Sequence, residues 1–158
     1  MKELSKLILA ILLCELVGII ATPFTISAIP TWYQTLNKPF FSPPNWIFGP
    51  AWTTLYFLMG VSVYLVWKKG IGKKGVNVAI GYFSIQLILN FFWSLMFFGF
   101  RSPILGLLDI VLLWVCIAIT MIKFWPISKA AFYLLVPYIF WVSFAAILNV
   151  SIVLLNSI

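Results

Sequence analysis

The chain has no histidine, two cysteines and three acidic residues among its 158 positions. Without histidine, a Ser-His-Asp triad and a histidine-ligated haem or zinc site are excluded. Cys14 and Cys116 lie far apart in apolar runs, so we interpret them as small buried hydrophobic residues. The sequence also lacks a P-loop and a GxGxxG motif, so nucleotide-driven chemistry has no support. We expect no metal site and no required cofactor.

The chain is rich in long apolar segments. Hydrophobic residues make up 64% of the sequence and charged residues only 8%. A soluble domain of this size cannot bury so much apolar surface, which predicts that lipid surrounds the protein. Five segments are long enough to span a bilayer, and they cover residues 7–29, 50–67, 76–100, 103–122 and 130–155. We therefore predict an all-α integral membrane protein: one domain, residues 1–158, forming a five-helix transmembrane bundle.

Local signals mark the ends of these segments. Gly49 and Ser102 each precede a proline, which predicts a capping residue followed by proline at the first helical position. Ser128 is a candidate cap for the fifth segment, and Pro137 predicts a kink within it. The first segment is too long for a cleaved signal peptide and is interrupted by Glu15, so we interpret it as a span.

The positions of the basic residues predict the orientation in the membrane. The net charge of +7 does not indicate a nucleic-acid partner, because the basic residues lie at the ends of apolar runs. With the N-terminus in the cytoplasm, Lys38 and Arg101 lie outside and eight lysines lie inside. This bias predicts a cytoplasmic N-terminus and an extracytoplasmic first loop. The eight inner lysines are Lys2, Lys6, Lys68, Lys69, Lys73, Lys74, Lys123 and Lys129.

The loop of residues 30–49, called the first loop below, is the most informative stretch of the sequence. It is rich in Trp, Tyr and Phe, and Pro39, Pro43 and Pro44 restrict its backbone. These residues predict a stiff aromatic cover over one end of the helix bundle. Such a cover indicates a binding site for a large, flat, apolar ligand.

Several polar groups within the spans are candidates for function. A charge within a bilayer is costly, so Glu15 and Asp109 either handle a ligand or a proton, or form structural links to polar groups of other helices. Asp109 and Arg101 lie at a similar depth in the membrane, so an ion pair between them is one candidate for such a structural link. Asn90, on one helix face with Gln86 and Trp93, either bonds to a neighbouring helix or orients a ligand carbonyl in a cavity.

Aromatic faces occur on two further spans. Trp52 and Tyr56 share one face of the second span, just below the first loop. Trp141, Ala145 and Leu148 share one face of the fifth, where the small Ala145 leaves space beside Trp141. Each face alone is typical of core packing, but three such faces beneath an aromatic loop favour a pocket.

The sequence resembles the translocator protein family, whose members are also called tryptophan-rich sensory proteins or peripheral benzodiazepine receptors. The resemblance is strongest within residues 32–60 and covers nearly the whole chain in the expected order. The residues that carry it are Trp32-Tyr33, Leu36, Lys38-Pro39, Pro43-Pro44, Trp46, Pro50, Trp52, Leu55-Tyr56, Met59-Gly60, Gln86-Leu87, Asn90, Phe97-Phe98-Gly99, Asp109, Pro137-Tyr138, Trp141, Phe144-Ala145 and Leu148-Asn149.

This resemblance implies a five-helix bundle, often a homodimer, with a ligand pocket under the first loop. The short C-terminus is similar to that of bacterial members, which implies a bacterial cell membrane. The implied ligands are porphyrins, related tetrapyrroles, sterols, and drugs of the benzodiazepine and isoquinoline carboxamide types. The implied ligand-binding residues are Tyr33, Pro43, Trp52, Tyr56, Asn90, Trp93, Trp141, Ala145 and Leu148.

Three functions follow from the resemblance and the residues together. The first is a membrane receptor or sensor of porphyrins, in which Lys38 either meets a propionate or anchors the loop at the interface. The second is a light- or oxygen-dependent enzyme that degrades protoporphyrin, in which Trp52 and Trp141 match the implicated tryptophans. The third is a transporter of tetrapyrroles or sterols. Residues 150–153 lack the Tyr and Arg of the cholesterol-recognition stretch in animal members, which disfavours a sterol role.

Overall fold

The five apolar runs form five helical segments in the computed structural model, which describes residues 2–157. Each is long and apolar enough to cross a membrane, and residues 2–157 contain no strand. This confirms the all-α, five-helix prediction. The segments are α1 (Glu3–Ala28), the 3-10 turn η2 (Asn45–Ile47) with α2 (Phe48–Trp67), α3 (Lys74–Ser94) with the π-helical turn η3 (Leu95–Gly99), α4 (Pro103–Phe124), and α5 (Lys129–Leu134) with α6 (Val136–Leu155).

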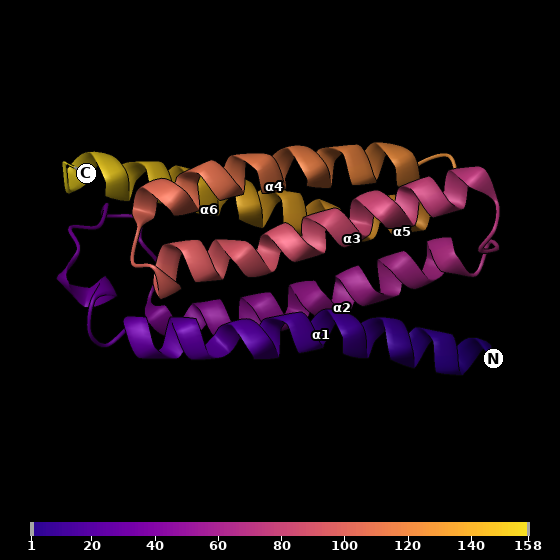
Figure 1. The fold of residues 1–158 in the computed structure, drawn as a ribbon, viewed down its shortest axis with the longest axis horizontal. Helices are drawn as coiled ribbons and strands as arrows, with labels where there is room; N and C mark the ends of the chain where they lie inside the picture. The colour runs from indigo at the N-terminus through magenta and orange to yellow at the C-terminus, as the bar shows by residue number, and fades with distance from the viewer. Residues whose placement is uncertain (1, 158) are drawn as a thin grey trace.

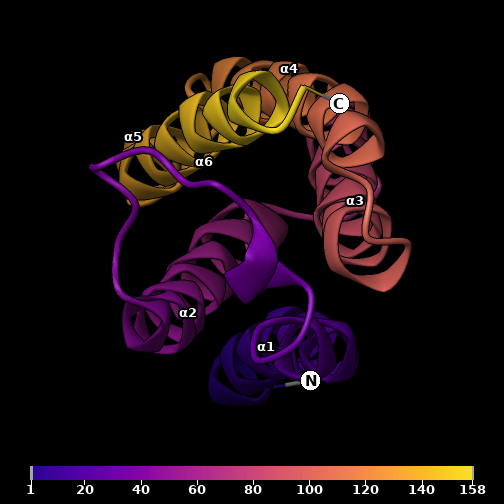
Figure 2. The same cartoon turned by 90° about the vertical axis from the view of Figure 1, so that its left-hand side faces the viewer.

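The five segments are arranged as a ring around a common axis. Viewed along that axis, the order is α1, α2, α5 with α6, α4 and α3 (Figure 2). The N-terminus lies at one end of the bundle and the C-terminus at the other (Figure 1). The α2–α3 and α4–α5 connections lie at the same end of the bundle as the N-terminus, whereas the first loop lies at the same end as the C-terminus (Figure 1).

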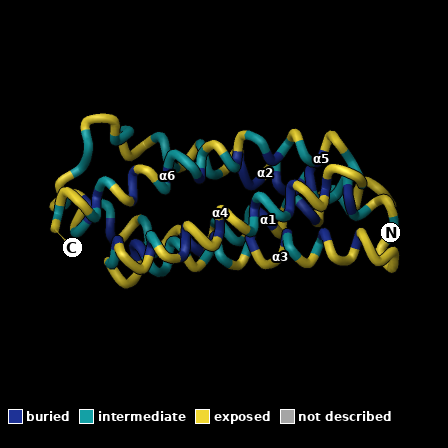
Figure 3. The backbone as a smooth tube through the Cα atoms, turned by 90° about the horizontal axis from the view of Figure 1, so that it is seen from above, coloured by how far each residue is buried: buried dark blue, intermediate teal, exposed yellow. Residues whose placement is uncertain are grey.

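The polarity of the molecule is that expected for a protein surrounded by lipid. Along each helix, buried positions alternate with exposed ones (Figure 3). Large apolar side chains such as Leu108 and Phe140 are exposed, while Gln86, Asn90 and Asn149 are buried. Polar groups within a bilayer are more stable where they face other helices than where they face hydrocarbon.

Two glycines permit close packing of α1 on α2. A Cβ atom on Gly60 would lie 2.5 Å from the Cα atom of Ile11, so only glycine lets the two backbones approach this closely. A Cβ atom on Gly18 would lie 2.6 Å from the Cε2 atom of Tyr56. The absence of a side chain at residue 18 therefore leaves room for the Tyr56 ring against α1.

Two of the three predicted helix caps are confirmed. The Ser102 hydroxyl accepts a hydrogen bond from the Leu105 amide at 3.3 Å, and the Ser128 hydroxyl accepts one from the Ala131 amide at 3.2 Å. The prediction for Gly49 is wrong, because α2 begins at Phe48, directly after η2. Pro50 still falls in the first helical turn, where a missing N–H costs no hydrogen bond.

The helix bounds differ from the expected ones at several ends. The first segment begins at Glu3 rather than residue 7, and α4 ends at Phe124 rather than residue 122. The fifth segment is interrupted at Leu135, two residues before Pro137. Proline lacks the N–H that would bond to the carbonyl four residues earlier, and this explains the break. Cys14 is buried, Cys116 is half-buried, and both are free thiols.

Candidate functional site

The first loop is packed against the bundle through Tyr33. Tyr33 begins the 3-10 turn η1 (Tyr33–Thr35) and is 2% exposed. Its ring centroid lies 6.2 Å from that of Phe97 and 5.7 Å from that of Phe98, both in η3. Burial raises the pKa of the Tyr33 hydroxyl above its ordinary value.

Asn156, just beyond α6, ties the first loop to the far side of the ring. Its side-chain oxygen accepts a hydrogen bond from the Asn37 amide, and its nitrogen donates to the Asn37 carbonyl, both at 2.9 Å. Figure 2 shows the loop reaching from α1 toward α6 before it returns to α2. We call this pair of hydrogen bonds the Asn37–Asn156 latch. The latch holds the loop across the end of the bundle.

Lys38 is used within the loop. Its ammonium group donates to the carbonyls of Tyr33 at 2.9 Å and Leu36 at 3.1 Å, and it lies 4.8 Å from the centroid of the Tyr33 ring. Lysine has three N–H donors, so two of them are committed to the loop backbone. Lys38 therefore stabilises the shape of the first loop.

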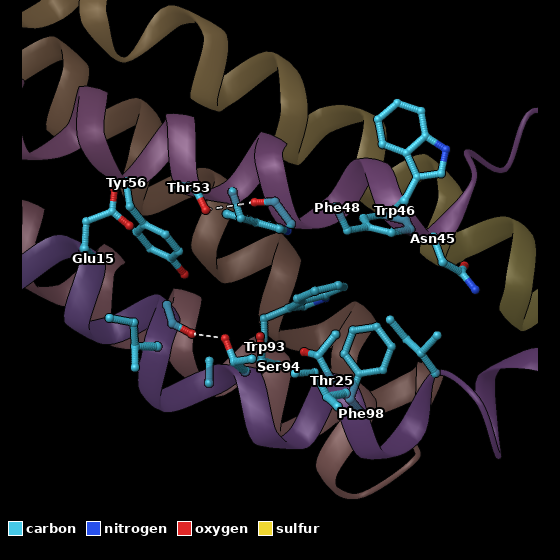
Figure 4. A pocket seen from close by; sticks show the side chains of 18 residues that line it. Glu15, Thr25, Asn45, Trp46, Phe48, Thr53, Tyr56, Trp93, Ser94 and Phe98 are labelled. Carbon is cyan, nitrogen blue, oxygen red and sulfur yellow. Dashed lines mark hydrogen bonds between the residues drawn. The ribbon is translucent and has the colours of Figure 1, made fainter.

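A cavity of about 390 Å³ lies beneath the loop between α1, α2 and the end of α3 (Figure 4). We call it the α1 cavity. Its wall combines aromatic rings with small and hydroxyl side chains. The principal lining residues are Glu15, Gly18, Thr22 and Thr25 of α1, Asn45 and Trp46 of η2, Phe48, Trp52, Thr53 and Tyr56 of α2, Trp93 and Ser94 of α3, and Phe98 of η3.

A second cavity, of about 20 Å³, lies on the α6 side of the same aromatic rings, and we call it the α6 cavity. This is room for about one water molecule. Phe48, Trp52, Trp93 and Phe98 line both cavities, so these four side chains form the wall between them. The other lining residues of the α6 cavity are Tyr33, Phe97, Trp141, Ala145, Leu148, Asn149 and Ile152.

Seven of the nine predicted ligand-binding residues line one or both of the two adjacent cavities. Trp52 and Trp93 line both cavities, and Tyr56 lines the α1 cavity. Asn90 and Pro43 line neither of them. The remaining predicted residues, Tyr33, Trp141, Ala145 and Leu148, line the α6 cavity.

Asn90 is committed to hydrogen bonds between helices. Its side-chain oxygen accepts a hydrogen bond from the Tyr56 hydroxyl, and its nitrogen donates to the Tyr138 hydroxyl at 2.8 Å. The Tyr138 hydroxyl in turn donates to the side-chain oxygen of Gln86 at 2.8 Å. This chain of hydrogen bonds joins α2, α3 and α6, so the helix-to-helix bonds that the sequence offered as one role of Asn90 are present.

The two carboxylates within the spans have different surroundings. Asp109 is buried, and its Oδ2 atom has no hydrogen-bond partner within residues 2–157. The expected pair with Arg101 does not form, since the one ion pair among these residues joins Lys6 and Glu3 at 2.7 Å. Glu15 lines the α1 cavity and has no structural link to another helix in the same described part of the chain.

The amino-acid sequence is similar to the sequences of known proteins over nearly its whole length. Residues 10–155 match the TspO/MBR family. This chain belongs to the TspO/MBR family. The resemblance found in the motifs is thereby confirmed, and the chain is an integral membrane protein of that family.

Individual TspO/MBR relatives are similar over most of their length. The Tryptophan-rich protein TspO of Chlorobaculum tepidum is 48% identical over 155 residues, which is 98% of each chain. The protein of the same name from Archaeoglobus fulgidus is 44% identical over 155 residues, covering 98% of this chain and 99% of the relative. The Translocator protein of Homo sapiens is 42% identical over 120 residues, covering 75% of this chain and 70% of the relative.

Among the α1 residues that line the site of this TspO/MBR chain, the sequence analysis identified Glu15 and missed the small residues beside it. Gly18, Thr22 and Thr25 all line the α1 cavity. Their spacing of four and then three residues places small side chains on one face of the first span. That spacing was a readable signal, because small residues on one face of a membrane helix leave room beside it.

Trp52 and Trp141 lie side by side between α2 and α6 in this TspO/MBR chain. Their ring centroids are 6.5 Å apart and the rings are nearly perpendicular, at 86°. The indole N–H of Trp141 is buried and has no hydrogen-bond acceptor within residues 2–157. Trp141 is therefore in direct contact with a ring that also faces the α1 cavity.

Proposed function

We propose that this TspO/MBR chain is a membrane receptor that binds a flat, hydrophobic ligand, with porphyrins as the principal class. Related tetrapyrroles and flat drugs of the benzodiazepine and isoquinoline carboxamide types share the required shape. The observation that carries the proposal is the cavity of about 390 Å³ beneath the first loop, with Trp52 and Trp93 in its wall.

The size and the lining of the α1 cavity support this ligand class. Small-molecule sites measure about 300–1,000 Å³ and are mostly apolar with a few polar groups. Trp52, Trp93 and Tyr56 offer aromatic rings to the cavity. Stacking between aromatic rings contributes about 0.5–1.5 kcal/mol beyond the burial of apolar area. A flat conjugated ligand gains more from such walls than a flexible chain does.

The α6 cavity limits where such a ligand lies. At about 20 Å³ it holds no ring system unless side chains move. A ligand that reaches Trp141 and Ala145 must therefore displace the shared wall of Trp52 and Trp93. We propose that the ligand body lies in the α1 cavity against this wall, and that the α6 cavity takes at most a substituent.

Titration with protoporphyrin in the dark tests the proposal, with intrinsic tryptophan fluorescence as the readout. We expect saturable quenching for the wild type and an affinity about three- to tenfold lower for Trp52→Phe, because a stacking partner is reduced. Trp125→Phe is the matched control, since Trp125 lies beyond α4 and does not line either cavity. Quenching that does not saturate, or equal affinities for both variants, would contradict the proposal.

The contact between Trp52 and Trp141 favours a second candidate function, the light-dependent degradation of the bound porphyrin with dioxygen as the oxidant. Two adjacent indole rings at the ligand wall are suited to exchange an electron with an excited porphyrin. Illumination of the complex tests this by absorbance. The enzyme function is supported if the porphyrin band is lost faster than in a protein-free control, and if Trp141→Phe stops this loss but still binds porphyrin in the dark. If the band of the wild-type complex is stable in light, only the receptor function remains.

A further inference from the structure

Glu15 is a carboxylate without a partner at one end of the α1 cavity. It lies beside Tyr56, far from the first loop (Figure 4). Within residues 2–157 its side chain has no ion pair, and the one basic residue between positions 7 and 67 is Lys38. Lys38 is committed to the loop at the opposite end of the cavity. An isolated carboxylate at this depth is costly unless water or a ligand meets it.

Three hydroxyl groups along the cavity wall also present acceptors, and that of Tyr56 lies beside Glu15 (Figure 4). The Thr22 hydroxyl donates to the Gly18 carbonyl at 2.7 Å, and the Tyr56 hydroxyl donates to Asn90. The Thr53 hydroxyl, farther along the wall, donates to the Gly49 carbonyl at 3.0 Å. A hydroxyl has one O–H donor, which each of these three hydroxyls already uses, so each can only accept a hydrogen bond from a ligand. Together with Glu15 they form a surface that accepts hydrogen bonds.

The end of the cavity near the first loop has the opposite character. The hydroxyls of Thr25 and Ser94 and the amide nitrogen of Asn45 line it, and none of them donates a hydrogen bond to another group in residues 2–157. Glu15 and Thr25 are ten residues apart on α1, which corresponds to about 15 Å along the helix axis. The cavity is therefore long enough to hold a ligand with two different ends.

We propose that the α1 cavity selects flat apolar ligands that carry a cationic nitrogen, and that Glu15 binds this group. The inference rests on the proposed function, because it assigns the polar chemistry of the same ligand site. A charged N–H group that meets Glu15 forms a charge-assisted hydrogen bond, which is roughly twice as strong as one between neutral groups. The rings of Trp52 and Tyr56 add cation–π attraction. An acidic substituent on the same ligand lies toward Thr25, Ser94 and Asn45.

Two probes with the same three-ring body test the role of Glu15. 9-Aminoacridine is protonated at neutral pH, whereas acridine is neutral. With the protein in nanodiscs of uncharged phosphatidylcholine, we expect the wild type to bind 9-aminoacridine at least about tenfold more tightly than acridine. Glu15→Gln removes this preference, and Glu15→Asp, which retains the charge, keeps part of it. Glu3→Gln is the matched control, because Glu3 is an acidic residue of α1 outside the cavity.

Equal affinities of the wild type for the two probes, or a preference that survives Glu15→Gln, would overturn the inference. Protoporphyrin titration of the same samples separates this failure from a failure of the proposed function. If protoporphyrin still binds saturably, the receptor proposal stands without the cationic selectivity. If protoporphyrin does not bind but the preference for 9-aminoacridine requires Glu15, the inference stands and porphyrin is the wrong ligand class. Size-exclusion chromatography verifies that each variant is folded.

Discussion

At the scale of single residues, the interior of the bundle depends on Tyr138. It is fully buried, and its hydroxyl both accepts from Asn90 and donates to Gln86. Because no water is present in hydrocarbon to replace a lost partner, each buried polar atom in this chain of hydrogen bonds depends on the next. The chain also fixes Tyr56, since Asn90 accepts the hydrogen bond of its hydroxyl.

Tyr138→Phe is therefore expected to destabilise the protein. It leaves the Gln86 oxygen and the Asn90 nitrogen without their partner, which costs about 1–3 kcal/mol in the free energy of unfolding. Tyr133→Phe is the control, because Tyr133 is 59% exposed and lies on α5, close in sequence. Its effect is expected to stay within about 0.5 kcal/mol. Unfolding in detergent measures both values, and equal stability of the two variants would refute this account.

The sequence predicted part of this arrangement and could not predict the rest. The spacing of Gln86 and Asn90 placed both amides on one helix face, as the structure has them. It could not decide between a partner helix and a ligand, because the hydroxyl groups that meet Asn90 lie 34 and 48 residues away. Partners at such separations are set by how the helices pack, which a single sequence does not reveal.

At the scale of secondary-structure elements, the five spans were predictable and their irregular ends were not. Length and hydropathy determine a membrane span, and both are visible in the sequence. The π-helical turn η3 (Leu95–Gly99) lies in a run that is apolar throughout, so a change of helical period leaves no trace in the hydrophobic pattern. Its effect is tertiary, since it places Phe97 and Phe98 against Tyr33 of the first loop.

The same limit applies to the candidate site. Tryptophan and proline marked the first loop and the second, third and fifth spans, so the predicted pocket was placed among them. The larger cavity lies against α1, where Glu15 was a candidate in the sequence but the small lining residues Gly18, Thr22 and Thr25 carry little chemical signal on their own. A cavity is a property of the space between helices, and the residues that create it are those whose side chains leave that space empty.

The Asn37–Asn156 latch makes a prediction about the first loop. Asn156→Ala removes the acceptor of the Asn37 amide, so we expect hydrogen exchange at that amide to become about fivefold faster, corresponding to the loss of about 1 kcal/mol. Ser151→Ala is the control on α6, because the Ser151 hydroxyl bonds within its own helix, to the Ile147 carbonyl. Hydrogen–deuterium exchange followed by mass spectrometry measures the change. If the two variants exchange at the same rate, the latch does not hold the loop.

At the scale of the whole molecule, the two ends of the bundle differ in charge and in construction. The connections with most of the lysines share one end with the N-terminus, while the first loop and Arg101 share the other (Figure 1). Basic residues are retained on the cytoplasmic side of a membrane, so this asymmetry predicts that the N-terminus is cytoplasmic. The first loop and the nearby end of the α1 cavity then face away from the cytoplasm.

Cysteine labelling in intact bacterial cells tests this orientation. Gln34 in η1 and Lys73 before α3 are exposed at opposite ends of the bundle. With a membrane-impermeant maleimide, we expect Gln34→Cys to react in intact cells and Lys73→Cys to react only after lysis. The unsubstituted protein gives the background, because Cys14 and Cys116 lie within α1 and α4. The opposite pattern would place the first loop in the cytoplasm, and a ligand that enters beneath the loop would then have to come from inside the cell.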